Sequence, residues 1–513
     1  MLFRHKKLLC LLTAVTFFFT TVSPALAATA RALGTSLKPQ LELLHEIPLG
    51  NVSADKIPDV TGKSWGSGIP FTEQVVSPDG KHILVIEADK MVLYSVGSGK
   101  KVWQKMTYGG VDNHEVVNDR VFLTEGYSYG KKKEHSYITC LDIETGKEFW
   151  KYDVQKDLKP LVNKYMPADA PPSYWGYLEI VIHGDKLILV GYNSWKKKER
   201  TDRVEVLLAL SHQGKLLWKV NSYGYPGLTC MSRIGLIGGK LVTGTYSYGE
   251  KITGQAYAHA FNLNTGEKLW KFEVKNEPSM NYSEKVNVAV DVAGDKVVAV
   301  TNFGRVYVLN FNGEKIREFT AFKPIVHKGI TVCTSVFAGV LGSGNTVVLA
   351  PGKTYVKGAT SYYAKPPVEH PDANSIMVFD LGGNLQWKFR LGGQASGRLI
   401  KNNYLIFSTT HNADTLDYSY TGVYVFDLSQ SGKGEVKKSV LDRYLGYYHT
   451  DGAVNSATKV SASDDGRIIA TATWPTRVGT KKYGKHALYI LRLKYAVLLS
   501  EKSQSMIYGD GWL

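Results

Sequence analysis

The sequence predicts an all-β fold, an eight-bladed β-propeller made of four-stranded antiparallel blades. Three observations support this class. The 513 residues are 44% hydrophobic and 12% aromatic, which excludes a disordered chain. A short segment recurs in which an alternating strand, a polar turn with glycine and a second strand follow one another. A further strand, preceded by its own turn, lies upstream of most copies, and one more strand before it completes a unit of four. Four-strand units of this size are typical of propeller blades.

A glycine in the turn and a tryptophan four residues later mark the repeat. Its clearest copies span residues 137–150 and 258–270, and the copy at residues 306–317 carries Arg317 where the others carry tryptophan. We expect the tryptophans to pack between neighbouring blades rather than to form a stacking platform. The repeat residues are Gly99, Trp103, Gly146, Trp150, Gly214, Trp218, Gly266, Trp270, Gly313, Gly383 and Trp387.

The last unit lacks an outer strand of its own, which would leave a sheet edge exposed. Degenerate copies at residues 423–428 and 488–493 bring the count to eight, but the unit near residues 457–494 has no Gly-x-x-x-Trp strand after it. Residues 38–50 contain an alternating segment, and we expect it to supply the missing outer strand and close the ring. Seven blades plus an unrelated terminal segment is the alternative.

The N-terminus has the features of a cleaved secretory signal. Three cations, Arg4, Lys6 and Lys7, precede an apolar run, and Ala25-Leu26-Ala27 supplies small residues for a signal peptidase. Residues 1–27 are therefore predicted to be a signal peptide, with an uncleaved membrane anchor as the alternative. Residues 28–513 would then form a single exported propeller domain without a transmembrane segment, either secreted or located in the cell envelope.

The charge and the cysteines constrain what the exported chain can do. The formal charge is +16, and removal of the three cations in residues 1–27 leaves +13, which favours encounters with anionic polymers or surfaces. Three cysteines remain, Cys140, Cys230 and Cys333, an odd number that argues against a disulfide framework. We expect buried free thiols, with one bridge plus a free thiol as the alternative.

The pattern Asp-x-x-Thr-Gly-Lys-x-x-Trp, seen at residues 142–150, resembles the repeat of pyrroloquinoline-quinone-type propellers. The resemblance covers nearly all of residues 28–513 and implies a propeller, but that family contains both quinoprotein alcohol dehydrogenases and non-enzymatic propellers resembling the outer-membrane assembly factor. In the dehydrogenases an adjacent Cys-Cys disulfide, a calcium ion and an Asp serve the quinone. This chain has no adjacent Cys-Cys pair, so the resemblance is to the non-enzymatic branch and no cofactor is expected.

Other catalytic and metal-binding patterns are also missing from the sequence. The 13 histidines include no His-x-x-x-His or His-Glu-x-x-His motif, and no Cys-x-x-Cys pair occurs. No metal site is therefore predicted. A quinoprotein-type or glycan-active propeller enzyme with an unrecognised site is kept as the alternative to a binding protein.

The extra residues of this chain are predicted to lie on one face. Six units have an enlarged connection between their second and third strands, and because strands in a blade alternate in direction, all these connections emerge on the same side. Together they carry +8 of the +13 charge. The six connections are residues 127–136, 192–203, 246–256, 353–374, 411–421 and 474–486.

Basic and aromatic side chains in these connections are the candidate ligand-binding residues. Long loops on a rigid scaffold often carry function, and such side chains suit stacking on sugars and pairing with phosphate or carboxylate. The alternative is that the tyrosines fill the hairpins and the lysines only add solubility. The candidates for charge are Lys131, Lys132, Lys196, Lys197, Lys481 and Lys482, and those for stacking are Tyr129, Trp195, Tyr248 and Trp474.

The sequence thus predicts an exported binding or scaffold protein. Its loop face, rich in Lys and Tyr, would contact an anionic glycopolymer of the cell envelope or a protein partner. Nucleic acid is not an expected partner, because no recognition module is visible. The sequence leaves open the ligand and the oligomeric state.

Overall fold

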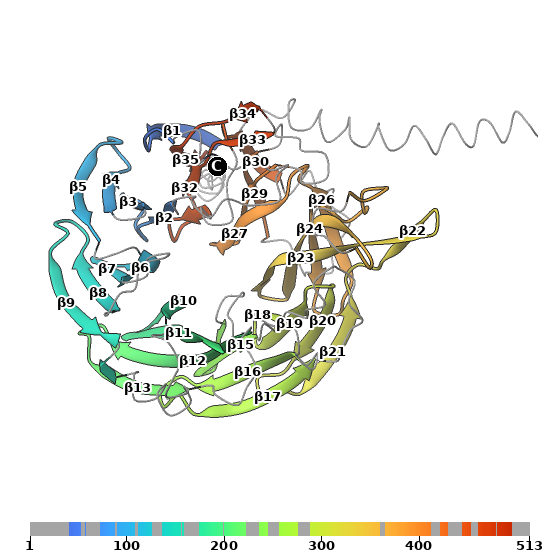
Figure 1. Cartoon of the computed structure of the whole chain (residues 1–513), viewed down its shortest axis with the longest axis horizontal. Helices are drawn as coiled ribbons and strands as arrows, with labels where there is room; N and C mark the ends of the chain where they lie inside the picture. Colours follow the sequence, from blue (N-terminus) through green and yellow to red (C-terminus); the bar gives the residue numbers. More distant parts are fainter. Residues whose placement is uncertain are drawn as a thin grey trace, which may run out of the picture.

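The computed structural model describes residues 41–52, 57, 72–87, 90–107, 111–125, 136–154, 156–157, 174–197, 200–221, 235–244, 256–274, 288–359, 365–411, 421–428, 444–452, 460–478 and 480–494. These residues form 35 β-strands arranged as eight antiparallel blades around a ring (Figure 1). The protein is an eight-bladed β-propeller, so the alternative of seven blades is wrong. Within the described ranges, no helix is long and apolar enough to cross a membrane.

The first four blades each have four strands in sequence order, running from the centre of the ring to its outside (Figure 1). Their strands are β2 (Thr72–Val76), β3 (His82–Glu87), β4 (Lys90–Ser95) and β5 (Lys101–Met106); β6 (Val111–Val117), β7 (Arg120–Glu125), β8 (Tyr137–Asp142) and β9 (Glu148–Asp153); β10 (Tyr174–His183), β11 (Lys186–Lys197), β12 (Arg200–Ser211) and β13 (Leu216–Asn221); and β14 (Gly235–Ile237), β15 (Lys240–Gly244), β16 (Ala256–Asn262) and β17 (Lys268–Val274).

Blades 5 to 8 follow the same plan, with one additional strand in blade 6 and a small hairpin in blade 8. Their strands are β18 (Val288–Ala293), β19 (Lys296–Thr301), β20 (Arg305–Leu309) and β21 (Lys315–Thr320); β22 (Ile325–His327), β23 (Ile330–Ser343), β24 (Thr346–Val356), β25 (Ser375–Asp380) and β26 (Leu385–Arg390); β27 (Ala395–Lys401), β28 (Tyr404–Thr409), β29 (Gly422–Asp427) and β30 (Tyr444–His449); and β31 (Val460–Ala462), β32 (Ile468–Thr473), the hairpin β33 (Thr476–Val478) and β34 (Lys481–Tyr483), and β35 (Ala487–Leu493).

The N-terminal strand β1 (Leu41–Pro48) is the outer strand of blade 8. It pairs antiparallel with β35 from Leu41 opposite Leu493 to Pro48 opposite Ala487, with a register shift between Leu43 and His45. Figure 1 shows the two ends of the described chain side by side at this blade. The ring is therefore closed by backbone hydrogen bonds between segments more than 400 residues apart.

The hydrophobic core is divided among the interfaces between blades. One cluster joins Phe122 and Ile138 of blade 2 to Leu187 and Leu208 of blade 3, all at most 2% exposed. Each blade is therefore buried on both faces. Neighbouring sheets support one another around the ring, which gives a rigid support for the loops at its rim.

Four of the five repeat tryptophans donate a hydrogen bond to a turn of the next blade. The Trp150 indole Nε1–H donates to the His212 carbonyl at 2.8 Å, and a Cβ built on Gly214 would lie 2.6 Å from the same ring. Only glycine leaves room for the indole in that turn. Equivalent indole hydrogen bonds run from Trp103 to Ile143 (2.7 Å), from Trp218 to Leu263 (3.1 Å) and from Trp270 to Phe311 (3.0 Å).

Two blades make this contact with a different side chain. Arg317 stands at the tryptophan position of blade 5, and its Nε–H donates to the Gly382 carbonyl at 3.2 Å. In blade 8 the position is taken by His45, whose Nε2–H donates to the Val96 carbonyl at 2.9 Å, with its ring against Gly99. The contact thus does not require an indole: His45 both donates the hydrogen bond and packs on the glycine, whereas in blade 5 Arg317 donates and the Phe319 ring packs on Gly383.

Candidate partner-binding face

One face of the ring carries the long connections. Second-to-third strand connections and the connections between blades emerge there, and we name it the loop-rich face. The short turns around Gly146, Gly214, Gly266 and Gly313 emerge on the opposite face. This follows from the alternating strand directions, which the antiparallel registers establish in every blade.

For several of the candidates predicted from the sequence, the structure describes no side chain. Lys131, Lys132, Tyr129 and Tyr248 lie outside the described residues. The stretch with Trp195, Lys196 and Lys197 ends strand β11, and Lys197 pairs with Arg200 of β12. The side chains of these three residues also lie outside the description. The connection expected at residues 192–203 is thus almost wholly paired strand, with β11 ending at Lys197 and β12 beginning at Arg200.

Lys481 and Lys482 are exposed on the hairpin β33–β34 of blade 8. The Lys481 ammonium lies 4.9 Å from the centre of the Tyr483 ring, so this tyrosine already holds a cation of its own chain. The two lysines lie on the loop-rich face, where a ligand could reach them.

Trp474, expected to stack on a ligand, is only 1% exposed. Its ring makes an edge contact with His486, with ring centres 4.4 Å apart. His486 Nε2 lies 3.1 Å from Thr72 Oγ1 in blade 1, and burial, with a smaller contribution from Lys90, lowers the pKa of His486 to about 4. Trp474 is therefore a core residue beside the seam between blades 8 and 1, and stacking on an external sugar is ruled out for it.

The most distinctive feature of the loop-rich face is an extension of blade 6. We define the arm as residues 325–334 and 353–356, which comprise β22, the first part of β23 and the end of β24. Strands β23 and β24 have 14 and 11 residues, about twice the length of the usual blade strand. Figure 1 shows β22 projecting outward from the ring beside them. Lys328 and Gly329, both with positive φ (48° and 78°), form the two-residue turn that joins β22 to β23.

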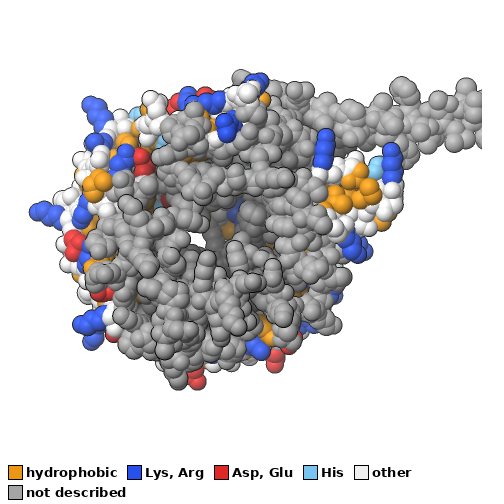
Figure 2. Space-filling model, in the orientation of Figure 1, with side chains coloured by type: hydrophobic (Ala, Val, Ile, Leu, Met, Phe, Trp, Pro, Cys, Tyr) orange, Lys and Arg blue, Asp and Glu red, His pale blue; other side chains and the backbone are white. Residues whose placement is uncertain are grey.

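The arm exposes apolar side chains among cations. Val326 is 70% exposed and Ile330 is 42% exposed. Between Glu318 and Glu369 the sequence has no acidic residue and five lysines, of which Lys353 is buried. The exposed ones are Lys323, Lys328, Lys357 and Lys365. At the projecting edge of the molecule, Figure 2 shows a hydrophobic patch with Lys or Arg side chains on either side.

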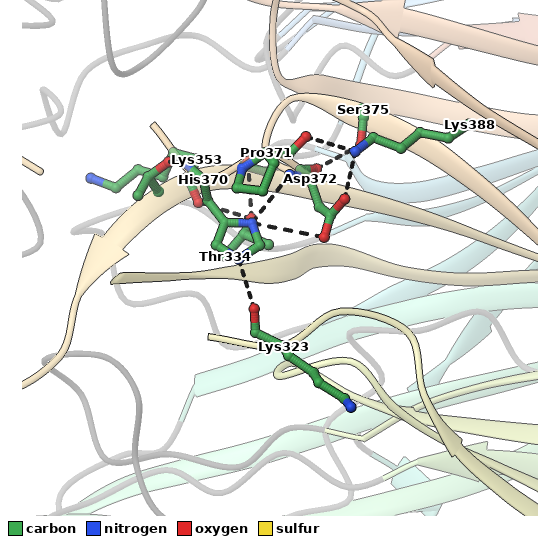
Figure 3. Close-up of polar contacts among 10 residues, drawn as sticks. Lys323, Thr334, Lys353, His370, Pro371, Asp372, Ser375 and Lys388 are labelled. Carbon is green, nitrogen blue, oxygen red and sulfur yellow. Dashed lines mark hydrogen bonds and ion pairs between the residues drawn. The ribbon is translucent and has the colours of Figure 1, made fainter. Parts of the chain in front are cut away.

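A polar network fixes the root of the arm (Figure 3). His370, 1% exposed, donates from Nε2–H to the Lys323 carbonyl at 2.9 Å and accepts at Nδ1 from the Asp372 backbone N–H at 3.2 Å. These two contacts select the neutral Nε2–H tautomer. Asp372 in turn accepts from the Lys388 ammonium of β26 at 2.5 Å, and Glu369 pairs with Arg390.

The network holds together the two connections at the base of the arm. Lys323 lies in the connection from blade 5, whereas His370 and Asp372 lie in the connection between β24 and β25. The Thr334 hydroxyl adds a contact across the long strands by donating to the Lys353 carbonyl at 3.1 Å. The arm is thus anchored on two sides, so its edge is presented in a fixed direction.

Sequence reasoning missed the arm's first half. The sequence predicts an enlarged connection at residues 353–374, but β22 lies in the connection between blades and carries no copy of the repeat. Two local signals could have found it. One is the alternating pattern Ile-Val-His-Lys-Gly-Ile-Thr-Val with Lys-Gly at a two-residue turn, and the other is the long stretch without acidic residues.

The residues of this chain do not fit pyrroloquinoline quinone. None of its four cysteines is adjacent to another in the sequence, so the disulfide that the dehydrogenases use cannot form. Across the part of the chain that the structure describes, no group of three or more His, Cys, Asp or Glu side chains is placed to hold a metal ion.

The described thiols are not reactive groups. Cys140 and Cys333 are buried, and Cys230 lies outside the described residues. Burial raises the pKa of each of the two thiols to about 11, so the nucleophilic thiolate is scarce at neutral pH. Both act as small apolar residues within their blades.

The fold and the repeat define a propeller of the pyrroloquinoline-quinone-like class. Within that class, the model of the family described as outer membrane protein assembly factor BamB matches residues 56–245, 128–324 and 254–433, together more than half of the chain. The chain belongs to this family.

Two solved structures are similar to this chain at low sequence identity. BamB from Moraxella catarrhalis is 14% identical, with a TM-score of 0.42 over 78% of this chain and 99% of that chain. Quinohemoprotein alcohol dehydrogenase from Comamonas testosteroni is 11% identical, with a TM-score of 0.48 over 91% of this chain and 77% of that chain. No curated protein matches the chain.

Proposed function

We propose that the protein is an exported scaffold that binds a protein partner through its loop-rich face. Family membership supports an assembly role, because the family is described as an assembly factor of outer membrane proteins. The signal-peptide features of residues 1–27 support export. The propeller provides rigidity, and the arm and loops provide the contacts.

The exposed apolar surface of the arm carries this proposal. Val326 and Ile330 face solvent on a projecting strand pair that the His370 network holds in place. Covering such surface stabilises a complex by about 25 cal/mol per Å² of apolar area. A protein partner has apolar side chains to do so, whereas a charged polysaccharide has few.

An anionic envelope glycopolymer is the second candidate ligand. The exposed Lys481 and Lys482 on β34 favour it, since together they offer two cations and no acidic neighbour within β34. Such a polymer would use charge alone at this hairpin, because the Trp474 ring beside it is buried.

Photo-crosslinking in the native host tests both candidates. A photoreactive amino acid replaces Val326, Lys481 or, as a control on the opposite face, Lys147, in the full-length protein, and adducts are analysed by mass spectrometry. We expect a protein adduct of discrete mass from position 326 and none from position 147. Polysaccharide adducts from position 481, without a protein adduct from position 326, would contradict the protein-binding role and support the glycopolymer.

A further inference from the structure

Strand β22 ends its sheet and leaves one backbone edge open. It pairs with β23 on one side, and none of the other described strands pairs with its second side. Edges of this kind are usually protected, since an open edge accepts strands from other chains. Here the edge projects from the ring and bears the most exposed large apolar side chain of the described residues, Val326.

The register shows which backbone groups face outward. Val326 lies opposite Thr331, and the Thr331 carbonyl accepts a hydrogen bond from the Lys357 N–H at 3.0 Å, on the side of β24. Opposite residues in an antiparallel pair direct their polar groups either toward each other or both away. Because Thr331 points toward β24, Val326 must point its N–H and C=O toward the open edge. One donor and one acceptor are therefore ready for an added strand.

We propose that this edge receives a short, acidic β-strand from a partner protein, an inference that rests on the scaffold function proposed above. The added strand would pair with Val326 through main-chain hydrogen bonds and cover its side chain with an apolar residue. Carboxylates flanking that residue would reach Lys323 and Lys328, which lie on either side of β22. This is strand addition, in which the backbone supplies affinity and the side chains supply specificity.

The positive charge of the arm favours an acidic strand over two other occupants, a second copy of the chain and a lipid surface. A second copy of the chain would bring two such lysine-bearing arms together with no acidic residue between Glu318 and Glu369 to offset them. A lipid surface would meet the arm at its tip, but the tip is Lys328-Gly329, and inserting it would bury a charge. Val326 is the middle residue of β22 and does not lie in the turn, as an added strand requires.

The test measures binding of a defined peptide to the full mature protein. The probe is a fluorescent peptide of alternating Glu and Val, followed by anisotropy. Two control peptides carry Lys in place of Glu, or N-methylated Val, which cannot donate from its backbone. We expect the acidic peptide to bind and both controls to bind at least about tenfold more weakly, since a few net hydrogen bonds are worth about 1.4 kcal/mol.

Variants locate the binding at the arm. Val326→Pro removes the outward N–H at a position where edge strands tolerate proline, and Val326→Thr keeps it. Lys323→Glu with Lys328→Glu reverses the local charge, and Lys147→Glu with Lys215→Glu makes the same change on the opposite face. We expect about tenfold weaker binding for V326P and for the arm charge reversal. V326T and the opposite-face pair should bind within about twofold of the wild type.

Three results would overturn strand addition. They are no binding up to about 1 mM peptide, equal binding by V326P and wild type, or binding to anionic phosphatidylglycerol vesicles without binding to the peptide. The scaffold function would survive any of them if protein crosslinks from the loop-rich face persist. If crosslinks are missing while the peptide binds at the arm, the scaffold function fails and the edge remains a strand acceptor.

Discussion

The turn glycines and the outer-strand tryptophans act as a matched set of residues. Gly214 has φ +79° and faces the Trp150 ring, whereas Gly184 has φ +59° and a Cβ added there would meet no atom within 4 Å. Both positions disfavour alanine by about 1–2 kcal/mol because of the left-handed backbone. Gly214→Ala must also displace the indole, at an additional cost of about 1–3 kcal/mol.

Denaturant unfolding of the two alanine variants separates these contributions. We expect Gly214→Ala to lose more free energy of unfolding than Gly184→Ala, by about the overpacking cost. Equal losses would show that the contact between Trp150 and the next blade adds nothing to stability.

Buried histidines make the fold sensitive to acid. The pKa of His486 falls from 6.5 to about 4 in the folded state because of burial, and Lys90 adds to the effect. The unfolded chain takes up a proton near pH 6.5 while the folded chain does not. This part of the stability is therefore complete above pH 6.5 and is lost as the pH falls from 6.5 toward 4.

Replacing His486 with Gln should weaken this dependence. We expect the difference in unfolding free energy between pH 7.5 and pH 5 to be smaller in His486→Gln than in the wild type. Exposed His183→Gln is the matched control and should keep the wild-type difference. An unchanged pH dependence in His486→Gln would mean that another group, such as buried His411, dominates.

At the scale of elements, β1 is the one strand among those described whose sheet partners come from the other end of the chain. Leu41 is 3% exposed and packs in a cluster with Leu399 of blade 7 and Leu491 of blade 8. Leu41→Ala should lower the free energy of unfolding by about 2–4 kcal/mol, because it leaves a cavity at the seam. The control Leu385→Ala, at a 48% exposed position, should change it by at most about 0.5 kcal/mol. Similar small effects from both variants would show that β1 is not docked.

The elements differ in how far the sequence could predict them. The blades were predictable because each copy of the Gly-x-x-x-Trp pattern repeats the same hairpin and the same contact with its neighbour. The arm was not, since β22 occurs once and depends on the tertiary anchor that His370 provides. Trp474 was misinterpreted because its position in a long connection predicts exposure, while its packing on His486 decides otherwise.

At the scale of the whole molecule, the residues that stabilise the closed ring are different from those proposed to bind a partner. Core clusters between blades, indole contacts and the β1–β35 pairing hold the ring together, and none of them involves Val326, Lys323 or Lys328. Changes in the arm should therefore alter binding without unfolding the propeller. The candidate site was only partly predictable for the same reason. The repeat pattern identifies residues that pack between blades, but it does not identify residues that bind a partner.

We expect a partner protein to bind this ring by pairing with the β22 edge. Hydrogen exchange of the full mature protein, alone and with the partner identified by crosslinking, tests it most directly. We predict that the Val326 amide exchanges rapidly in the free protein and slowly in the complex, while the blade cores remain unchanged. Protection confined to other loops, with Val326 still exchanging rapidly in the complex, would contradict the claim.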